Sequence, residues 1–464
     1  MKYSDKTFCP LPWIHLLIGE TGNLQVCCRS HVSENQGILR DKNKSPLQVG
    51  ETSVEEVRNS ELLKELRLSM LKGEAHPTCV RCLTEEKISM QNSFRLSQQR
   101  LWEKDFTFES AKKVTQKDGA IDAKESPLLS VDLTLGNKCN LKCRMCRPET
   151  SDYWYEDHYK IWGKDSFFSV DGKEFKIIQN EKNQWRIENG HYSWIDQTST
   201  WEEINRALKN CLYIYITGGE PLIIEKHYEL LEKLVEEKRA DKIDLEYNTN
   251  LTVLPQKLFS AWKHFKSIVL HVSLDGVGKV NDYIRHPSKW NHIERMIHKL
   301  DQTVNDKFYL SFTSTIQIYN ILDIPNLIKW KLSSNFQHIN GTESAPLFSF
   351  KTLNNPKFLN VQSLPGDVKT EVAKILRNSY PSLKKHCFEN ESNLRKGHYL
   401  MDKAEEAIEG LINFMHLKDS SCHFKKFLFY TRKLDAIRFE KFETACPELF
   451  KLLQKYFNRK VNIA

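Results

Sequence analysis

Three cysteines, Cys139, Cys143 and Cys146, stand in the spacing C-x3-C-x2-C. The apolar alternation over 131–135 is typical of a strand, and Gly136 begins the loop that carries the three thiols. A [4Fe–4S] cluster normally takes four thiolates. Three leave one iron open to an outside ligand, as in catalytic metal sites that keep one position open. The spacing therefore predicts an open-site iron–sulfur cluster, with zinc binding or inert thiols as the alternatives.

A second cysteine set lies near the N-terminus. Cys9 and Cys27 flank Gly22 in a C-x12-G-x4-C pattern, and Cys79 and Cys82 follow as C-x2-C. Gly22 suits a tight turn between two short strands, which would bring Cys9 and Cys27 together. Four thiolates close a cluster's coordination sphere. We expect a second [4Fe–4S] cluster here, with zinc as the alternative and the adjoining Cys28 as a spare thiol.

A helix is expected between the two halves of this cysteine set. Ser53 to Glu56 has the form of a capping box, and apolar residues over 62–70 fall on one face. Gly73 is a plausible helix stop. The helix would return Cys79 and Cys82 to the hairpin.

Downstream of Cys146, strand-like and helix-like segments alternate, which predicts parallel βα units. With the strand before Cys139 they make six units, fewer than the eight of a closed barrel. The fold class predicted is therefore α/β, a partial (β/α)6 barrel with an open side. The further strands are expected at 213–216, 243–247, 268–272, 309–316 and 348–352.

An insertion interrupts the first two units at about 165–195. A helix is expected over 154–163, and Val170-Asp171-Gly172-Lys173 predicts a hairpin after it. The aromatic residues of the insertion either cover the active site or form a satellite core. Residues after 366 are predicted to be mostly helical, most clearly over 404–415.

Polar residues follow several predicted strands, where parallel sheets place their ligands. The first strand after the insertion ends in Gly218-Gly219-Glu220-Pro221, whose glycines expose backbone groups and whose carboxylate accepts from an ammonium. The next two strands end near Asn250 and near Ser273 and Asp275, and Arg285 follows. Taken singly, each of these residues is also an ordinary turn, cap or surface residue.

Together, the three-cysteine loop and the Gly-Gly-Glu-Pro strand end resemble the signature of the radical S-adenosylmethionine (SAM) enzymes. The resemblance implies that SAM fills the open iron position and that Gly218–Pro221 hold its amino group. It also implies contacts of Asn250, Ser273 and Asp275 with the ribose and carboxylate of SAM, and of Arg285 with the carboxylate. The residue before the last cluster cysteine is usually aromatic in that family and is Met145 here.

The N-terminal cysteine set resembles the auxiliary-cluster "twitch" module, a shortened SPASM domain. That module usually follows the SAM-binding domain, whereas here it precedes it. The two resemblances cover residues 9–95 and 131–365. They imply three domains: an auxiliary cluster module over 1–105, a radical SAM core over 126–365, and a helical region over 366–464.

Composition limits the class of protein. The chain has 464 residues, 40% of them apolar and 28% charged, which is ordinary for a soluble globular protein. The N-terminus lacks the apolar region of a secretory signal, and no stretch of about 18 apolar residues occurs. We therefore expect a cytoplasmic protein without a membrane partner, in which twelve cysteines serve metal or redox chemistry rather than disulfides.

The net charge of +8 is modest for this length, and basic residues are mixed with acidic ones, as over 225–239. A solvated surface is expected rather than one that binds nucleic acid.

The function expected from the resemblance is reductive cleavage of SAM to a 5′-deoxyadenosyl radical that takes hydrogen from an unactivated carbon. The auxiliary cluster would assist a net oxidation or cross-link, and flavodoxin or ferredoxin would supply the electron. Only eight residues precede Cys9, leaving no room for a leader-binding domain, so a small-molecule substrate is favoured over a peptide. The alternatives are a two-cluster electron-transfer protein and a zinc-stapled nucleic-acid-binding protein.

Overall fold

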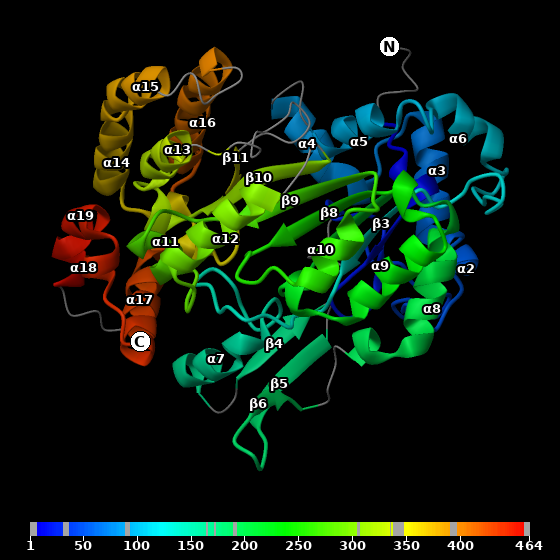
Figure 1. Cartoon of the computed structure of the whole chain (residues 1–464), viewed down its shortest axis with the longest axis horizontal. Helices are drawn as coiled ribbons and strands as arrows, with labels where there is room; N and C mark the ends of the chain where they lie inside the picture. The colour runs from blue at the N-terminus through cyan, green and yellow to red at the C-terminus, as the bar shows by residue number, and fades with distance from the viewer. Residues whose placement is uncertain are drawn as a thin grey trace. The chain divides into compact units, whose positions relative to one another are not determined.

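The computed structural model describes residues 7–30, 37–88, 93–163, 166–170, 173–188, 193–303, 307–334, 336, 348–389 and 397–458 (Figure 1). The chain divides into two compact units, each with its own dense internal contacts. Unit 1 comprises Met1–Lys138, Phe167–Tyr247 and Pro255–Ile268, and unit 2 comprises Cys139–Ser166, Asn248–Leu254 and Val269–Ala464.

Unit 1 begins with the predicted hairpin. Strands β1 (His15–Ile18) and β2 (Leu24–Gln25) pair antiparallel around Gly22, whose φ of +83° suits glycine. The predicted helix is two helices, α2 (Val54–Arg58), capped by the Ser53 hydroxyl, and α3 (Glu61–Lys72), ended by Gly73 with left-handed backbone. The other helices of this segment are α1 (Leu11–Ile14), α4 (Val80–Ile88), α5 (Phe94–Trp102) and α6 (Phe108–Val114).

The strands of unit 1 follow the order β8-β7-β3-β1-β2. Strands β3 (Ser130–Thr134), β7 (Tyr213–Thr217) and β8 (Asp244–Thr249) pair parallel, and β3 also pairs parallel with β1. In β7 the buried residues are Ile214 and Ile216, and the alternate residues are half-buried. This period of two means that apolar side chains pack on one face and polar ones occupy the other. The helices of this part are α8 (Thr198–Ala207), α9 (Lys226–Glu236) and α10 (Gln256–Trp262).

The insertion forms a separate three-stranded antiparallel sheet of β4 (Phe167–Val170), β5 (Lys173–Gln179) and β6 (Trp185–Ile187). Val170 pairs with Lys173, so the predicted hairpin is confirmed, although its turn residues lie outside the described part. Phe168 and Phe175 are buried with ring centroids 5.3 Å apart. These two rings belong to a small satellite core, as one of the two sequence interpretations expected.

Unit 2 holds most of β9 (Ser267–Ser273) and the parallel pair β10 (Phe308–Ile316) and β11 (Phe348–Thr352), in the order β11-β10-β9. All six predicted strands are therefore present. Among the described residues no strand order closes into a ring, which confirms an open α/β sheet rather than a closed barrel.

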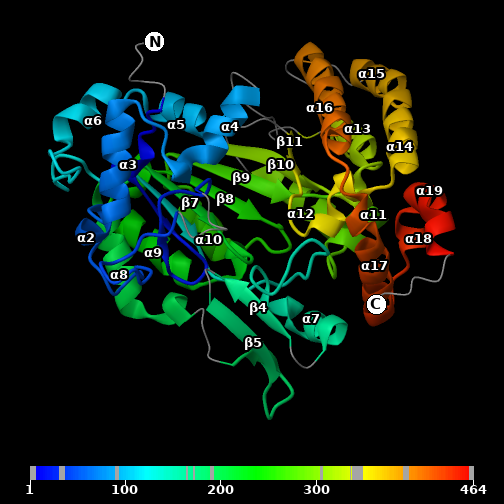
Figure 2. The ribbon, with the colours of Figure 1, turned by 180° about the vertical axis from the view of Figure 1, so that it is seen from behind.

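Helices dominate the rest of unit 2. The predicted helix over 154–163 is α7 (Tyr155–Trp162), and α11 (Lys279–Ile284), α12 (Trp290–Thr303) and α13 (Ile324–Ser333) accompany the strands. The predicted helical C-terminal region is confirmed, and α14, α15 and α16 lie side by side in both views (Figures 1 and 2). Its elements are α14 (Gly366–Asn378), α15 (Tyr380–Glu389), α16 (Gly397–Leu417), α17 (Phe424–Arg438), α18 (Phe442–Ala445) and α19 (Pro447–Phe457).

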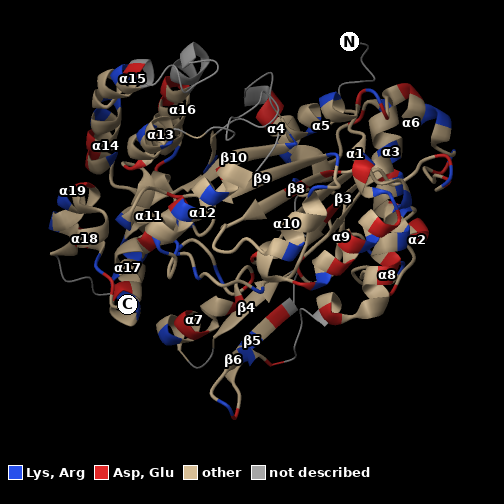
Figure 3. Ribbon diagram, in the orientation of Figure 1, with Lys and Arg blue, Asp and Glu red and all other residues tan. Residues whose placement is uncertain are grey.

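Charged residues of both signs are interspersed on the outer helices, as along α9, whose sequence is KHYELLEKLVE (Figure 3). Such mixing is the solvated surface expected from the sequence. Among the described residues, no helix has the length and apolar character that a membrane span requires.

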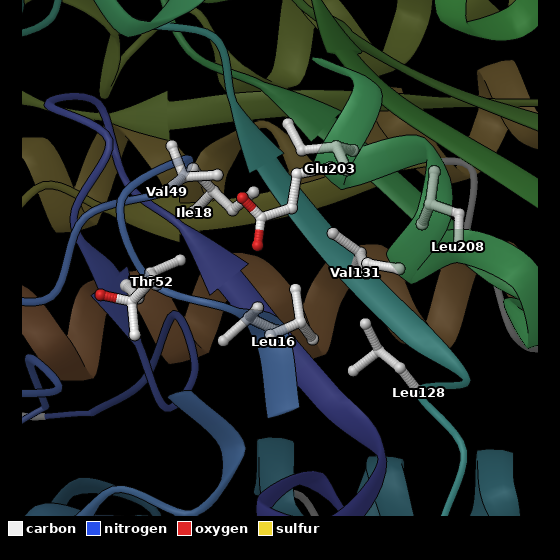
Figure 4. A pocket seen from close by; sticks show the side chains of 12 residues that line it. Leu16, Ile18, Val49, Thr52, Leu128, Val131, Glu203 and Leu208 are labelled. Carbon is white, nitrogen blue, oxygen red and sulfur yellow. The ribbon is translucent and has the colours of Figure 1, made fainter. Parts of the chain in front are cut away.

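A small cavity of about 20 Å³ lies under the sheet of unit 1 (Figure 4). Leu16 and Ile18 of β1, Val131 of β3 and Leu208 after α8 form much of its wall, and Glu203 also borders it. The cavity has room for about one water molecule, but its wall is almost wholly apolar. It is a packing gap rather than a ligand site.

Candidate iron–sulfur and SAM site

The three cysteines of the C-x3-C-x2-C loop converge in unit 2. Cys143 is buried, while Cys139 and Cys146 are half-buried. A hydrogen bond between the Cys143 and Cys146 thiols, with burial, raises the pKa of Cys143 well above its ordinary value. The same hydrogen bond lowers the pKa of Cys146, on which Cys139 also acts electrostatically. Cys146 is therefore near enough to both Cys143 and Cys139 for each to influence its ionisation.

Aromatic side chains hold the backbone of this loop. The indole N–H of Trp154 donates to the carbonyl oxygen of Cys143 at 2.8 Å, and the Tyr430 hydroxyl donates to that of Arg144 at 2.7 Å. The two rings lie stacked, with centroids 6.2 Å apart. Tyr430 belongs to α17, so the C-terminal region takes part in positioning the cluster loop.

Arg144, between the second and third cysteines, anchors the loop further. Its side chain is fully buried, and one Nη donates to Asp435 at 2.6 Å and to Glu440 at 2.7 Å. The guanidinium also lies 3.5 Å from the ring centroid of Tyr283, whose carbonyl accepts from Nε at 2.9 Å. A buried charge held by two carboxylates and an aromatic face fixes the loop firmly. The sequence reasoning missed this residue, because its partners lie almost 300 positions away.

Arg285 and Asp275 form an ion pair in the same unit, with Nη2 to Oδ2 at 2.8 Å. Asp275 is completely buried, and its other oxygen accepts from the Thr315 backbone N–H at 2.7 Å. Burial raises the pKa of Asp275 against the opposing effect of Arg285. Arg285 acts electrostatically on Cys143, and its buried Nε has no hydrogen-bond partner among the described residues. A cation with an unused donor therefore lies at the three-thiol loop.

Asn250, at the end of β8, is bonded within unit 2. Its amide oxygen accepts from Thr252, and its amide nitrogen donates to the side chain of Asn140 at 3.0 Å. Asn140 directly follows the first cluster cysteine, so Asn250 supports the loop. The predicted contact residues Ser273, the last residue of β9, and Met145 are both half-buried, and Met145 packs against the core of unit 2.

The Gly-Gly-Glu-Pro segment belongs to unit 1 and directly follows β7. Gly218 and Gly219 have positive φ, and a Cβ on Gly219 would lie 2.0 Å from the carbonyl oxygen of Lys138. Glu220 donates its backbone N–H to that same oxygen at 2.9 Å. The glycines thus let the chain pass directly against the residues before Cys139. Glu220 is buried, and Oε1 accepts from the N–H of Leu222 in the short helix begun by Pro221.

The second predicted cysteine set also converges, in unit 1. Burial and the neighbouring Cys27 raise the pKa of Cys9 well above its ordinary value, and Cys79 and Cys82 add to the effect. Burial raises the pKa of Cys27 and of Cys79 to about 12. Cys28 is exposed and acts electrostatically on Tyr215. The structure groups Cys27 with the other three thiols.

Backbone donors and one charged pair surround this four-thiol group. The N–H of Leu11 is bonded to Cys9, that of Arg29 to Cys27, and that of Arg95 to Cys82. Arg95 is buried and bonds through its guanidinium to Glu86 at 2.5 Å and to the carbonyl oxygen of Phe8 at 2.7 Å. Such donors stabilise thiolates. Among the described residues, no three His, Cys, Asp or Glu side chains form a site for a single metal ion.

A group of polar side chains lies on one face of β3, β7 and β8. By strand register, Asp132 is opposite Tyr215, and Tyr215 is opposite Glu246. Tyr213 donates its hydroxyl to Glu246. Burial and then Glu246 raise the pKa of Asp132 to about 8, while burial lowers the pKa of the adjacent His15 to about 3. Both side chains are thus neutral at pH 7, and their 3.8 Å contact is not an ion pair.

A comparison with protein families finds a match for one part of the chain. Residues 133–330 match the family model of the Radical SAM superfamily. No curated protein matches the chain.

Several solved structures resemble the chain at low identity. The histidine-tagged form of anSMEcpe with bound AdoMet is 15% identical, with 56% of this chain and 60% of that one covered and a TM-score of 0.36. SuiB of Streptococcus suis bound to S-adenosylmethionine is 16% identical, with 70% and 61% covered and a TM-score of 0.31. SuiB bound to the precursor peptide SuiA is 15% identical, with 75% and 67% covered and a TM-score of 0.33.

The chain spans about 60% of the length of anSMEcpe and of SuiB bound to S-adenosylmethionine. Similarity this low defines neither the substrate of this chain nor a second cluster. The family match, by contrast, covers the three-cysteine loop, the strand ends at 217–221, 249–250 and 273–275, and Arg285. Residues 133–330 of this chain therefore form a radical SAM domain.

Proposed function

We propose that this chain is an enzyme that cleaves SAM reductively and uses the resulting 5′-deoxyadenosyl radical to take hydrogen from an unactivated carbon. The convergence of three thiols beside Arg285, within a radical SAM domain, carries this proposal. A [4Fe–4S] cluster on Cys139, Cys143 and Cys146, when bound, supplies one electron to the sulfonium of SAM. The products of cleavage are methionine and the radical.

The residues of the site fit this cofactor pair. Three thiols of one loop, with no fourth in the C-x3-C-x2-C motif, would leave one iron for the amino and carboxylate groups of SAM. The unused Nε–H of Arg285 is a suitable donor to that carboxylate, and Asp275 positions the guanidinium. Asn250 supports the loop through Asn140. By the resemblance of their motifs, Gly218–Pro221 would bind the SAM ammonium, Ser273 its ribose, and Met145 would pack on its adenine.

The polar face of β3, β7 and β8 would orient the substrate. Tyr213 and Glu246 form a bonded pair there, and Asp132 carries a proton at neutral pH because its pKa is near 8. These groups offer both donors and acceptors to a small molecule or a peptide.

The four-thiol set fits a second [4Fe–4S] cluster with no iron open to SAM. Burial alone disfavours the thiolate forms, so a positively charged iron centre is what would stabilise them. Its role would be to accept the electron left on the substrate radical after hydrogen loss, which makes the net reaction an oxidation or a cross-link. We place the auxiliary module at 1–105, the core at 126–365 and the helical region at 366–464, in a cytoplasmic protein.

The deciding experiment is SAM cleavage by anaerobically reconstituted protein. With dithionite and SAM, the protein should release 5′-deoxyadenosine slowly even without substrate, and Cys143→Ala should abolish the release. Cys446→Ala, a buried cysteine outside both sets, is the matched control and should keep the activity. Equal 5′-deoxyadenosine from Cys143→Ala and the parent would contradict the proposal.

The experiment also separates the two alternatives. An electron-transfer protein with two clusters would take up iron and sulfide but leave SAM intact. A zinc-stapled nucleic-acid-binding protein would purify with stoichiometric zinc and take up no iron.

A further inference from the structure

A pocket of about 360 Å³ opens in unit 2 beside the third cysteine of the cluster loop. Four segments form its wall: the loop from Cys146 to Pro148, helix α7, residues 355–358 after β11, and the first turns of α17. The volume is within the range of about 300–1,000 Å³ that ligand pockets span. Of its lining residues, the function proposed above uses only Cys146.

The pocket is positively charged. Arg147, Lys357 and Lys426 line it, and no Asp or Glu is among its described lining residues. Lys357 and Lys426 are exposed, whereas Arg147 also approaches Glu149 at 3.6 Å. The three cations come from three separate segments, and all three are exposed.

Aromatic side chains line the pocket together with these cations and the cluster loop. The Nζ atom of Lys426 lies 5.0 Å from the ring centroid of Trp162 and 5.4 Å from that of Phe358. The side chain of Trp162 is 43% exposed at the opening. Deeper in, Trp154 and Tyr430 are the two residues whose hydrogen bonds hold the backbone of the cluster loop. The pocket therefore extends from an exposed, basic rim to the residues that position the cysteines.

We propose that this pocket is the docking surface of an acidic electron-carrier protein. The inference rests on the function proposed above, which needs one electron for each SAM cleaved. The reduced carrier would lose one electron and the cluster held by Cys146 would gain it, with no bond made and no proton moved. The pocket wall is where a partner approaches a cluster cysteine directly.

A protein fits this surface better than a small anion. A small-anion site gathers buried donors around one charge, whereas the lysines that line this pocket are exposed. Exposed cations of one sign steer an oppositely charged protein and raise its association rate about 10- to 1,000-fold. Exposed Trp and Arg side chains are also the residue types most enriched among the energetic anchors of protein interfaces.

The test compares two reductants. In the double variant Lys357→Glu with Lys426→Glu, 5′-deoxyadenosine formation driven by reduced flavodoxin should fall at least tenfold in kcat/KM. Formation driven by dithionite, which needs no docking, should stay within twofold of the parent. The matched control is Lys425→Glu with Lys451→Glu, two exposed lysines that do not line the pocket. It makes the same change in net charge and should behave as the parent with both reductants.

A second measurement does not depend on the loaded enzyme. Binding of flavodoxin to cluster-free protein, followed by biolayer interferometry, should weaken in the pocket variant and weaken in the parent as salt is raised. Equal flavodoxin kinetics in the pocket and control variants, or equal losses with both reductants, would overturn the docking assignment. So would tight binding of free FMN that only the pocket variant loses, since that result reassigns the pocket to a small anion.

The two proposals fail differently. If the parent cleaves no SAM with dithionite, the enzymatic proposal is wrong, while the binding measurement still decides the docking surface.

Discussion

At the scale of single residues, burial decides the charge of the groups on the polar face of unit 1. Asp132 has a pKa of about 8 in the folded protein because burial and then Glu246 disfavour its carboxylate. In the unfolded chain an aspartate titrates near 3.9. Between about pH 4 and pH 8 the unfolded state therefore loses this proton while the folded state keeps it. The contribution of Asp132 to stability must fall as pH rises through that window.

The variant Asp132→Asn removes this titration. Its free energy of unfolding should rise relative to the parent as pH increases from 4 to 8, and the difference should be constant above about pH 8. Urea unfolding at several pH values measures it. His15 contributes a slope of the opposite sign below pH 6.5, but it is present in both proteins and cancels. A difference independent of pH would mean that Asp132 is ionised in the folded state.

At the scale of elements, the strands are the part of the fold that the sequence predicted best. Apolar alternation over 131–135 and 243–247 identified β3 and β8, and all six predicted strands lie within two residues of their observed bounds. The cysteine spacing and Gly22 likewise predicted which thiols come together. The local pattern was sufficient because a strand that is buried on one face has apolar residues at every second position of its sequence.

Other features were invisible in the sequence for a physical reason. Arg144 is an arginine between two cysteines, and nothing local says that Asp435 and Glu440 neutralise it. Asn250 and Asp275 were expected to face SAM, whereas the structure shows their side chains bonded to Thr252 and to Arg285. Such pairings depend on tertiary contacts between distant segments. Whether these two residues also contact SAM stays a prediction.

The cavity behind β3 gives a prediction at this scale. Val131→Ile adds one methyl group to a gap of about 20 Å³ lined by apolar side chains (Figure 4). Burying one further methyl group is worth about 0.8 kcal/mol, and isoleucine suits a strand. Thermal unfolding should show a rise in Tm of a few degrees. Val131→Ala, which enlarges the gap, should lower Tm, and a lower Tm for both variants would show that the gap cannot take a methyl group.

At the scale of the whole molecule, the proposed function divides seven cysteines into a three-ligand set and a four-ligand set. Reconstituted protein should hold about eight irons, from two cubane clusters, and replacing Cys139, Cys143 and Cys146 by Ala should leave about four.

Cys79→Ala with Cys82→Ala should still cleave SAM but fail to complete substrate oxidation. Adding SAM should change the paramagnetic resonance signal of the three-cysteine cluster only.

The control for this prediction is Cys28→Ala, which should keep both clusters because the G-x4-C spacing assigns Cys27 as the ligand and Cys28 is exposed. Loss of one cluster in Cys28→Ala, with both retained in Cys27→Ala, would show that the ligand had been misassigned.

The anchoring of Arg144 by Asp435 and Glu440 has a consequence for folding during synthesis of the protein. Arg144 and Asp435 are 291 positions apart, so at about 5–20 residues per second the ribosome needs roughly 15–60 s to supply the partner after the loop emerges. Cys9, Cys27, Cys79 and Cys82 are all translated before Arg144. The nascent chain therefore has the four N-terminal cysteines complete early, while the C-x3-C-x2-C loop is fixed only after the last tenth of the chain is made. Iron delivery to the two sites should be ordered in time, with the N-terminal set ready first.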